Sequence, residues 1–328
     1  MTDSLPLVSV VTPVFNGEKH VAQCIESVLA QTYPRWTHTL VDNCSKDGTA
    51  EIIQRYADKD ARIRMVSNAK FVRVIENYNN AFRQTSPDAK YTKLVAADDA
   101  LMPECLEKMV GFAEPHPSVA IVGAYGIRET NVLWRGLPWW QSFVRGPDAL
   151  RERLLGGPYV FGTPTAVLLR ADVVRARDPF FNESNLHADS EMCFDVLVDH
   201  DFGFVQQILT IQGAAIADSL TSFSERFQTY FSHILYELVK YGPRHLTDAE
   251  LAQRIESHLT DYYRYLGEQA FKNRGREFWS YHRGKLADAG RPLDRLRLAG
   301  AVAGYVADRV GNPKRSLEGA LRRLSRKK

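Results

Sequence analysis

The sequence predicts an α/β protein in which a mostly parallel sheet carries helices on both faces, followed by a C-terminal helical region. Over the first two hundred residues, short β-branched runs alternate with segments whose apolar residues recur at helical spacing. Polar residues come directly after the predicted strands, where open α/β sheets bind ligands. After about Thr221 the spacing stays helical. We therefore expect an α/β domain over residues 1–220 and a helical region over residues 221–328.

Strands and helices are expected to alternate in the first part of the chain. The first strand, Leu7–Phe15, is a β-branched run that ends at the turn signal Asn16-Gly17. The last helix begins near Pro103, a residue suited to the first helical turn. The predicted elements are strands at 7–15, 37–43, 63–68 and 91–97, each followed by a helix, at 21–32, from 47, at 74–82 and from 103. This order is typical of a parallel sheet covered on both faces.

The remaining elements carry weaker signals. From about Arg128 the pattern loosens into a tryptophan-rich stretch, Leu133–Phe143, and a Gly/Pro-rich loop that runs into a strand by Arg170. A helix with acidic residues in its first turn is expected at 187–200, followed by a strand at 202–211. The C-terminal region is expected to form helices at 224–241, 248–271, 293–310 and 313–328, of which the last two are basic.

Composition and the cysteine pattern exclude several classes of protein. A hydrophobic fraction of 45% and a charged fraction of 25% are typical of a globular protein. Four dispersed cysteines without a CxxC pair argue against a zinc site and against a disulfide framework. The first residues lack a basic segment followed by an apolar core, and the chain has no long continuous apolar window. We therefore expect a cytoplasmic protein without a secretory signal or a transmembrane helix.

Charge is distributed unevenly along the chain. Residues 291–328 hold eleven Lys or Arg and three Asp or Glu, a net +8, so the first 290 residues sum to −5 for a total of +3. A basic end on a mildly acidic body favours contact with an anionic surface. We predict peripheral contact with the inner face of a membrane and no nucleic-acid partner. The alternatives are solvated helices, or helices that pack on the body or on another subunit.

Asp98 and Asp99 stand side by side at the end of the predicted strand at 91–97. Like charges this close repel, and burying either one is costly without a partner. A hard divalent cation such as Mg²⁺ or Mn²⁺ prefers carboxylate oxygens and retains water or phosphate oxygens. The pair could therefore hold a cation and, through it, a pyrophosphate. The alternative is that one of the two aspartates caps the helix that begins near Pro103.

A further acid, Asp42, ends the second strand and could accept hydrogen bonds from a nucleobase or ribose, whereas Asp47 or Thr49 is more simply a helix cap. The segments VSVVTPVFNGEKHVAQCIESVLAQTYPRWTHTLVDNCSKDGT and LVAADDALMP together resemble the family 2 glycosyltransferases. The resemblance covers roughly residues 5–220 and is most specific over the first hundred. It implies the GT-A fold, a nucleotide-diphosphate-sugar donor, a divalent cation and inversion at the anomeric carbon.

The resemblance also implies roles for single residues. Asp42 contacts the base of the donor, which is expected to be a UDP, GDP or dTDP sugar. Asp98 and Asp99 serve the ribose and the diphosphate-bound metal, Mg²⁺ or Mn²⁺, with the division between them left open. The residues expected around the donor nucleotide are Pro13, Phe15, Glu18, Asp42 and Asp98.

Two departures from the family pattern concern the metal. Many members have an acid two residues before Asp98, and here that position is Ala96. Many members also have a histidine near the metal in a segment that resembles AAIADSLTSF, where this chain has Ala214–Ala217. Asp98 and Asp99 are therefore the only carboxylates expected at that strand end.

An inverting transfer needs a carboxylate that deprotonates the acceptor hydroxyl. The segment NLHADSEMCFDVL resembles the family's acidic motif at the start of a helix, and Asp189 matches the general base best. Glu191, two residues further along, is the alternative, and His187 could assist. A purely structural role for Asp189 would be to stabilise the N-terminus of its helix.

Aromatic and glycine-rich segments lie between the donor motifs and the predicted base. Aromatic faces suit sugar rings, and glycines permit close approach. Trp139, Trp140, Gly162 and Thr163 are therefore expected on the acceptor side. Core packing is the alternative for Trp134, Trp139 and Trp140.

We expect a metal-dependent, inverting glycosyltransferase that moves a sugar to a hydroxyl of a glycan or of a lipid-linked acceptor. Assembly of cell-surface polysaccharide is the expected setting by analogy with the family. A second hypothesis is a non-catalytic sugar-nucleotide-binding or scaffold protein of the same fold, which the missing acid at Ala96 would favour. A nucleotidyltransferase is a third option, but PVFNGEKH has one glycine where those enzymes carry a glycine-rich basic loop.

Overall fold

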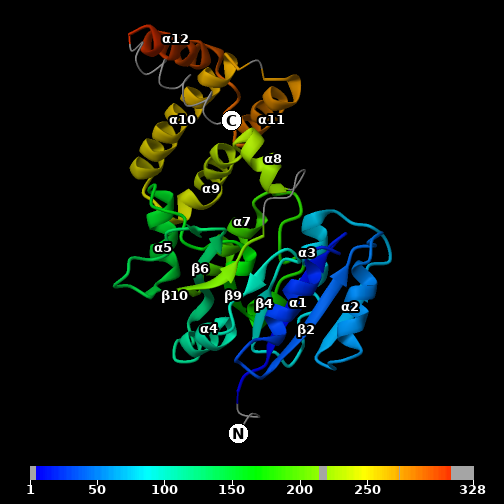
Figure 1. Cartoon of the computed structure of the whole chain (residues 1–328). Helices are drawn as coiled ribbons and strands as arrows, with labels where there is room; N and C mark the ends of the chain where they lie inside the picture. Colours follow the sequence, from blue (N-terminus) through cyan, green and yellow to red (C-terminus); the bar gives the residue numbers. More distant parts are fainter. Residues whose placement is uncertain (1–4, 214–219, 273, 312–328) are drawn as a thin grey trace. The chain divides into compact units, whose positions relative to one another are not determined.

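The computed structural model describes residues 5–213, 220–272 and 274–311. The chain divides into two compact units, residues 1–217 and residues 218–328. The first unit is built on a β-sheet, whereas the described residues of the second unit form helices and their connections (Figure 1). The basic helix expected at 313–328 and the segment Ala214–Ala217 lie outside the described residues.

A ten-stranded mixed sheet forms the centre of the first unit. Its strands are β1 (Val8–Val14), β2 (Trp36–Asp42), β3 (Ile63–Ser67), β4 (Tyr91–Leu94), β5 (Ala100–Leu101), β6 (Val119–Arg128), β7 (Asn131–Leu133), β8 (Phe143–Val144), β9 (Val167–Arg170) and β10 (Asp201–Ile211). The strand order is β3-β2-β1-β4-β9-β6-β10-β5, with β7 beside β6 and β8 beside β10. β1 to β4 pair in parallel, whereas β9 is antiparallel to both β4 and β6.

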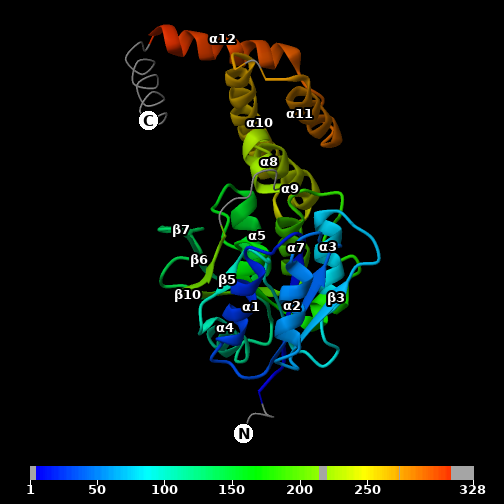
Figure 2. The same cartoon turned by 45° about the vertical axis from the view of Figure 1, so that its right-hand side comes forward.

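Helices cover both faces of this sheet, as Figure 1 and Figure 2 show. Because parallel crossovers are right-handed, the connections β1–β2 and β2–β3 place their helices on one face, and the return from β3 to β4 places its helix on the other. The helices are α1 (Val21–Leu29), α2 (Thr49–Ala57), α3 (Val74–Phe82), α4 (Cys105–Ala113), α5 (Gly146–Leu154), the 3-10 helix η2 (Pro164–Ala166), α6 (Ala171–Arg175) and α7 (Ala188–Leu197). The predicted α/β fold class is confirmed.

The register of the parallel strands brings polar residues to one edge of the sheet. All seven residues of β1 are buried, and α1 packs its apolar stripe against the same core. In the parallel register Val14 lies opposite Asp42, and Asp42 lies opposite Ser67. The carboxyl ends of β1, β2 and β3 therefore coincide, and the chain that leaves β4 reaches Asp98 and Asp99 beyond the same edge.

The second unit contains α8 (Leu220–Phe227), α9 (Tyr230–His245), α10 (Asp248–Ala270), α11 (Arg276–Asp288) and α12 (Arg295–Gly311). Thr247 and Glu250 form a reciprocal capping box at the start of α10, which fixes where that helix begins. The single helix expected at 224–241 is wrong, because Gln228 adopts a positive φ of 51° between α8 and α9. α11 was not expected from the sequence patterns.

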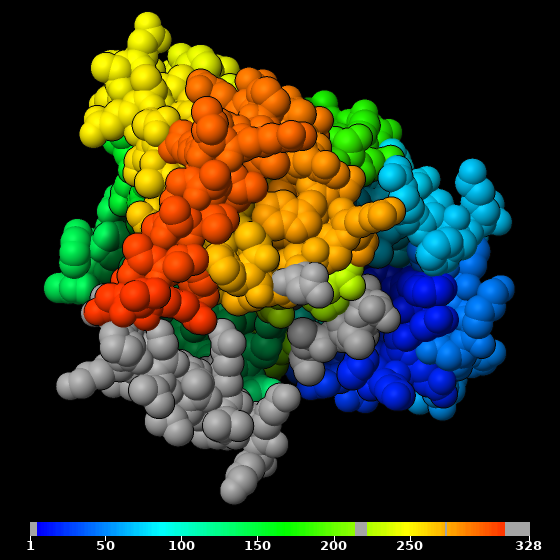
Figure 3. Space-filling view, turned by 90° about the horizontal axis from the view of Figure 1, so that it is seen from above, coloured from blue at the N-terminus to red at the C-terminus, as the bar shows by residue number. Residues whose placement is uncertain are grey.

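α12 packs on α10 through small residues. A Cβ atom added at Gly267 of α10 would lie 2.8 Å from the carbonyl carbon of Ala301, so glycine permits this close crossing. Figure 3 shows α12, in orange to red, on the surface of the second unit. No helix of the described residues is both long enough and apolar enough to cross a membrane.

Candidate functional site

The loops that follow β1 and β2 are hydrogen-bonded to each other beyond the carboxyl edge of the sheet. The N–H of Asn16 donates to Ser45 Oγ (2.9 Å), and the N–H of Gly17 donates to Thr49 Oγ1 (2.8 Å). In return, the N–H of Lys46 donates to Asn16 Oδ1 (2.9 Å). These bonds fix the loop that the sequence predicted at Asn16-Gly17, and they hold the start of α2 against it.

Glu18 and Asp47 serve the same junction. The N–H of Glu18 donates to Asp47 Oδ2 (3.1 Å), and Glu18 Oε2 accepts the N–H of Gly48 (3.3 Å). Asp47 Oδ1 accepts the N–H of Thr49 (3.2 Å), the first residue of α2, whereas the N-cap residue of that helix is Gly48. Glu18 therefore lies at the expected edge with its carboxylate directed at the start of α2.

An aromatic pair follows β1. Pro13 is buried inside the strand, whereas Phe15 is exposed just beyond it. The ring centroid of Phe15 lies 4.9 Å from that of Phe71, which is exposed as well. Two exposed rings in contact form an apolar surface on which a planar base could stack.

Asp42 ends β2 and Asn43 follows it, and both polar residues are buried. The carboxylate of Asp42 accepts the N–H of Ser45 at 3.3 Å to either oxygen. The side-chain amide of Asn43 makes two hydrogen bonds to the backbone of Val72. Its Nδ2 donates to the Val72 carbonyl (2.8 Å), and its Oδ1 accepts the Val72 N–H (3.0 Å). Asn43 therefore positions the loop that carries Phe71, next to Asp42.

Asp98 and Asp99 follow β4 in different environments. Asp99 is buried, and its Oδ1 accepts the N–H of Gly213 (3.0 Å). The side chain of Thr165 gives the Asp99 carboxyl a second hydrogen bond. Asp98 is half-buried. The helix-cap alternative for this pair is wrong, because the N-cap residue of α4 is Glu104 and it makes no side-chain cap bond.

The buried carboxyl of Asp99 resists ionisation. Burial is the main cause that raises its pKa to about 6, and the negative charge of Asp98 raises it too. Hydrogen bonds from Thr165 and Gly213 and the positive charge of Arg128 act in the opposite direction. A cation beside Asp98 and Asp99 would favour their ionised forms, so the pair suits a divalent cation electrostatically.

Arg128 brings a positive charge to this edge, and the sequence patterns did not predict it. It is the last residue of β6, and its Nη2 donates to Gln212 Oε1 (2.9 Å). Gln212 Nε2 donates in turn to Thr163 Oγ1 (2.6 Å). Among the described residues, the buried Nε of Arg128 has no hydrogen-bond partner. A guanidinium with an unused donor suits a phosphate oxygen.

Asp189 and Glu191 begin α7 and differ in burial. Both oxygens of the buried Glu191 accept hydrogen bonds from Asn182 Nδ2 (3.2 and 3.0 Å), and Oε2 accepts a third from Asn185 Nδ2 (2.7 Å). Asp189 is half-buried, as is His187 just before the helix. Glu191 therefore fixes the loop that precedes α7, and Asp189 is the more accessible of the two carboxylates.

Tyr78 on α3 is affected by the charges of all three predicted acids, and sequence reasoning did not identify it. Its ring stacks on Phe181 with a centroid separation of 6.1 Å. Burial raises the pKa of the Tyr78 hydroxyl, and the charges of Asp99, Asp98 and Asp189 raise the same pKa further. The charges of all three carboxylates therefore act on this one hydroxyl.

The residues at the strand end fit a hard divalent cation. Asp98 and Asp99 offer the carboxylate oxygens that Mg²⁺ and Mn²⁺ prefer. Within residues 5–213, 220–272 and 274–311, no group of three or more His, Cys, Asp or Glu side chains could hold an ion. Two carboxylates suffice for a cation that keeps water or phosphate oxygens in its other positions.

Ala96 stands where many family members have an acid, and its N–H donates to Thr165 Oγ1 (3.1 Å).

The tryptophans of the predicted acceptor side separate into two groups. Trp139 and Trp140 are 81% and 72% exposed, with ring centroids 5.5 Å apart, so core packing is wrong for both. Trp134 packs against the sheet, and its Nε1 donates to the carbonyl of Ala124 (2.9 Å). Gly162 adopts φ +83°, and a Cβ atom added there would lie 3.2 Å from the Trp134 ring, so glycine is required at this turn.

Comparison with known proteins decides the family. The family model described as glycosyl transferase family 2 matches residues 9–177. The chain belongs to this family. Two relatives named as glycosyltransferases come from Bacillus subtilis strain 168. EpsE is 33% identical over 181 residues, which cover 53% of this chain and 59% of EpsE. TuaG, named for teichuronic acid biosynthesis, is 30% identical over 162 residues, which cover 48% of this chain and 62% of TuaG.

Solved structures share the GT-A fold that family 2 membership implies. Residues 1–349 of Staphylococcus aureus TarS, in complex with UDP-GlcNAc, align with a TM-score of 0.63 at 17% identity, over 86% of this chain and 80% of that one. The mannosyltransferase PcManGT from Pyrobaculum calidifontis, in complex with GDP-Man and Mn²⁺, aligns with a TM-score of 0.55 at 14% identity, over 96% of this chain and 84% of that one.

Proposed function

We propose that this chain is a glycosyltransferase that moves a sugar from a nucleotide-diphosphate donor to an acceptor hydroxyl, with inversion at the anomeric carbon. One observation carries the proposal: the charges of Asp98, Asp99 and Asp189 all act on the hydroxyl of Tyr78. Donor-binding acids and a general base must lie within reach of the same bond, and their shared effect on one hydroxyl supports this assignment. Family membership supports the same reaction class. Residues 1–220 would form the transferase domain and residues 221–328 its helical region.

The donor nucleotide is proposed to lie over the carboxyl ends of β1 and β2. Phe15 and Phe71 would stack on the base, and the Asp42 carboxylate would accept hydrogen bonds from it. Pro13 and Glu18 would line the same pocket. The TarS and PcManGT structures were solved with UDP-GlcNAc and GDP-Man, which supports a UDP, GDP or dTDP sugar as the donor class.

Asp98 and Asp99 are proposed to hold Mg²⁺ or Mn²⁺, with Asp98 also close to the ribose. When bound, the cation would supply positive charge that offsets the charge on the departing diphosphate. The guanidinium charge of Arg128, which acts on Asp99, would attract a phosphate oxygen on the same side. Tyr78 would donate its hydroxyl to one of the three carboxylates or to the transferred sugar, because burial and the acids keep it protonated.

Asp189 is proposed as the general base. The acceptor oxygen would attack the anomeric carbon while its proton moves to the Asp189 carboxylate, and the bond to the diphosphate would break on the opposite side. Glu191 is less suited to this role, because its oxygens already accept bonds from Asn182 and Asn185. We assign Glu191 to positioning the loop before α7.

The acceptor is proposed to be a glycan or a lipid-linked glycan of cell-surface polysaccharide assembly. TuaG is named for teichuronic acid biosynthesis, and TarS is named as a poly(ribitol-phosphate) transferase, which supports this setting. Trp139, Trp140, Gly162 and Thr163 would lie on the acceptor side. Peripheral contact with the inner face of the membrane is proposed through the basic C-terminal end.

Turnover of candidate donors tests the reaction. The wild-type chain should hydrolyse or transfer one of the UDP, GDP or dTDP sugars in the presence of Mn²⁺. Asp189→Asn should reduce turnover at least a hundredfold while donor binding stays, since general-base catalysis typically contributes about 10²–10⁴-fold. Glu191→Gln should lower the free energy of unfolding. The turnover of its folded fraction should stay close to that of the wild type.

Full turnover by folded Asp189→Asn would remove the base assignment. No turnover and no donor binding by the wild-type chain would instead favour the scaffold hypothesis, to which the alanine at position 96 points.

A further inference from the structure

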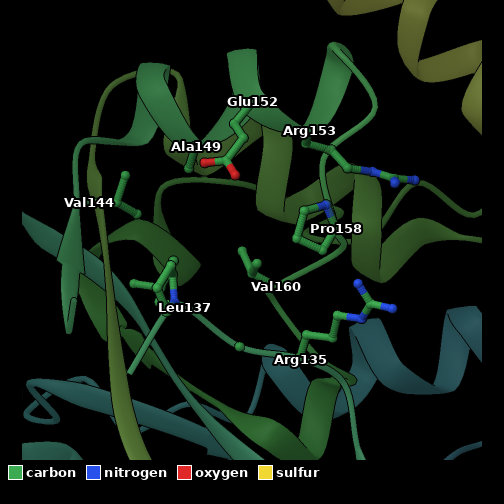
Figure 4. A pocket seen from close by; sticks show the side chains of 10 residues that line it. Arg135, Leu137, Val144, Ala149, Glu152, Arg153, Pro158 and Val160 are labelled. Atoms are coloured by element: carbon green, nitrogen blue, oxygen red, sulfur yellow. The ribbon is translucent and has the colours of Figure 1, made fainter. Parts of the chain in front are cut away.

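A cavity of about 220 Å³ opens between the segment 135–138 and α5. Figure 4 shows its apolar wall, to which Leu137, Val144, Pro158 and Val160 contribute. None of the acids proposed for the reaction lines this cavity. It is therefore a separate feature of the first unit, beyond the site proposed for the donor.

Two arginines give the cavity a positive side. Arg135 and Arg153 extend along one side, whereas the carboxylate of Glu152 points to the other (Figure 4). Arg135 is exposed and pairs with no carboxylate among the described residues. Arg153 is half-buried, and its Nη1 donates to the carbonyl of Gly157 at 3.4 Å. Its guanidinium lies 5.8 Å from the ring centroid of Tyr159. These contacts hold a guanidinium at the cavity wall.

Aromatic side chains stand at one end of this segment. Trp139 and Trp140 follow directly on Pro138, which lines the cavity, and both are largely exposed. Exposed tryptophan faces pack well against sugar rings, because they offer a large apolar surface with little conformational freedom to lose. The cavity and the tryptophan pair together offer an oxyanion site beside a sugar platform.

A short segment connects the cavity with the proposed reaction site. Pro158 and Val160 line the cavity, and the same segment continues to Thr165, which bonds Asp99. Between them, the Tyr159 hydroxyl donates to the carbonyl of Gly162 (3.1 Å), which stiffens the connection. The segment 158–165 therefore joins the cavity wall to the loop that contacts Asp99.

We propose that this cavity binds an anionic group of the acceptor glycan, a phosphate or a carboxylate, while Trp139 and Trp140 stack on a neighbouring sugar. The assignment rests on the proposed function for its place in the reaction. Guanidinium forks match the geometry of both oxyanions, and the apolar wall strengthens the attraction by excluding water. A neutral acceptor would gain only neutral hydrogen bonds from the two arginines, so an anionic glycan should bind more tightly.

Binding of three soluble probes of equal length tests this proposal by calorimetry on the full chain. The probes are a glycerol-phosphate trimer, a galacturonic acid trimer and maltotriose, which carry phosphates, carboxylates and no charge. Both anionic probes should bind about tenfold more tightly than maltotriose at low salt, and this preference should shrink as salt screens the charges. The tighter of the two anionic probes identifies the oxyanion.

Substitutions locate the site. Arg135→Gln is decisive, because Arg135 is exposed and its loss should leave the fold intact; it should weaken the anionic probes about tenfold and leave maltotriose unchanged. Arg153→Gln should act in the same direction. Arg145→Gln is the matched control, since Arg145 is exposed just before α5 but does not line the cavity. The pair Trp139→Ala and Trp140→Ala should weaken the galacturonic acid trimer and maltotriose, which carry sugar rings, and leave the ring-free glycerol-phosphate trimer unchanged.

The possible outcomes separate this inference from the proposed function. Any of three results would overturn the cavity assignment. They are equal affinity for charged and neutral probes, no binding of any probe to folded protein, and unchanged binding of the anionic probes by Arg135→Gln. Nucleotide binding in the presence of Mn²⁺, measured on the same variants, should stay at the wild-type level. If nucleotides bind and the anionic probes do not, only the cavity assignment fails. If the probes bind and no nucleotide does, the donor proposal fails instead.

Discussion

At the scale of single residues, Asp99 shows how a buried acid depends on partners that are remote in the sequence. Its strand-end position could be predicted, because the apolar run before it is a local pattern. Its partner Gly213 could not, since it lies 114 residues further along the chain. A Cβ atom added at Gly213 would come within 2.4 Å of the carbonyl oxygen of Asp98, so the close approach requires glycine.

Arg128 gives the residue-scale prediction. Arg128→Gln removes a charge close to Asp99 and a free Nε–H, and it should raise the dissociation constant of the nucleotide diphosphate about tenfold. Arg128→Lys keeps the charge but not the planar fork. Its dissociation constant should therefore lie between those of Arg128→Gln and the wild type. Calorimetric titration with the nucleotide that binds best measures the effect.

Lys59→Gln is the matched control for Arg128, because it removes one positive charge at an exposed position after α2. Equal affinities of Arg128→Gln and Lys59→Gln would show that Arg128 does not contact the diphosphate.

At the scale of elements, α3 connects the donor side with the loop before α7 through a set of asparagines. Asn68 Nδ2 donates to Asn43 Oδ1 (3.0 Å) and to Asn77 Oδ1 (2.8 Å). On another part of the helix, Asn79 Nδ2 donates to the carbonyl of Phe181 (2.9 Å), and Asn79 Oδ1 accepts its N–H (2.7 Å). The sequence predicts the helix and its asparagines but not these partners, because the bonds to Asn43 and Phe181 join segments far apart in the chain.

Asn79 gives the element-scale prediction. Asn79→Ala leaves the N–H and the carbonyl of the buried Phe181 without partners, which should cost about 2–4 kcal/mol in the free energy of unfolding. Urea unfolding measures this loss. Asn131→Ala, at an exposed position of β7, is the control and should stay within about 0.5 kcal/mol of the wild type. Equal stability of the two variants would contradict the bridging role of α3.

β6 is the central strand that the sequence patterns miss. Its residues Val119–Arg128 include Gly123 and Gly126, and glycine inside an apolar run weakens a strand prediction. The structure explains them, because Cβ atoms there would lie 2.9 Å from the Phe202 ring and 2.8 Å from the Trp134 ring. Had the strand been recognised, Arg128 at its end would have been a candidate by the same rule that identified Asp42.

At the scale of the whole molecule, buried histidines lower the stability of the fold in acid. Burial lowers the pKa of His38 to about 3, and its Nε2 lies 2.9 Å from Thr12 Oγ1. In the unfolded chain the His38 imidazole has its ordinary pKa of 6.5 and takes up a proton near that pH. Stability from neutral His38 is therefore present above about pH 6.5 and is lost as pH falls toward about pH 3. Burial lowers the pKa of His282 in the second unit to about 4, so its effect has the same sign.

Urea unfolding between pH 7 and pH 4 tests the His38 effect. His38 alone should cost the wild type about 3 kcal/mol over this interval. His38→Gln starts from lower stability at pH 7, because it disturbs the core, but its stability should fall less steeply as pH decreases. Parallel curves for the two proteins would mean that His38 does not titrate on unfolding.

α12 presents an apolar stripe to solvent that could lie on a membrane. Leu296 is 86% exposed and Val310 is 76% exposed, and Ala299, Ala303 and Val306 fall between them at helical spacing on the exposed side. The residues that follow α12 are strongly basic. An apolar stripe with basic residues beside it is typical of a helix that binds anionic lipid.

Sedimentation with lipid vesicles tests this contact. The full chain should sediment with vesicles that contain phosphatidylglycerol and much less with pure phosphatidylcholine. Leu296→Glu combined with Val310→Glu should abolish sedimentation without loss of fold, since both side chains are exposed. Val132→Glu, which is exposed in the first unit, is the control. If the wild type stays in the supernatant with both lipids, the membrane proposal is wrong.

The most direct test of the central claim is a thermal-shift measurement with UDP, GDP, dTDP and CMP and their sugars, with and without Mn²⁺. A ligand that binds the folded state raises the melting temperature by mass action. The account predicts a shift for one nucleotide diphosphate that needs Mn²⁺, and loss of that shift in folded Asp98→Asn and Asp99→Asn. A shift that persists in both variants, or no shift for any nucleotide, would contradict it.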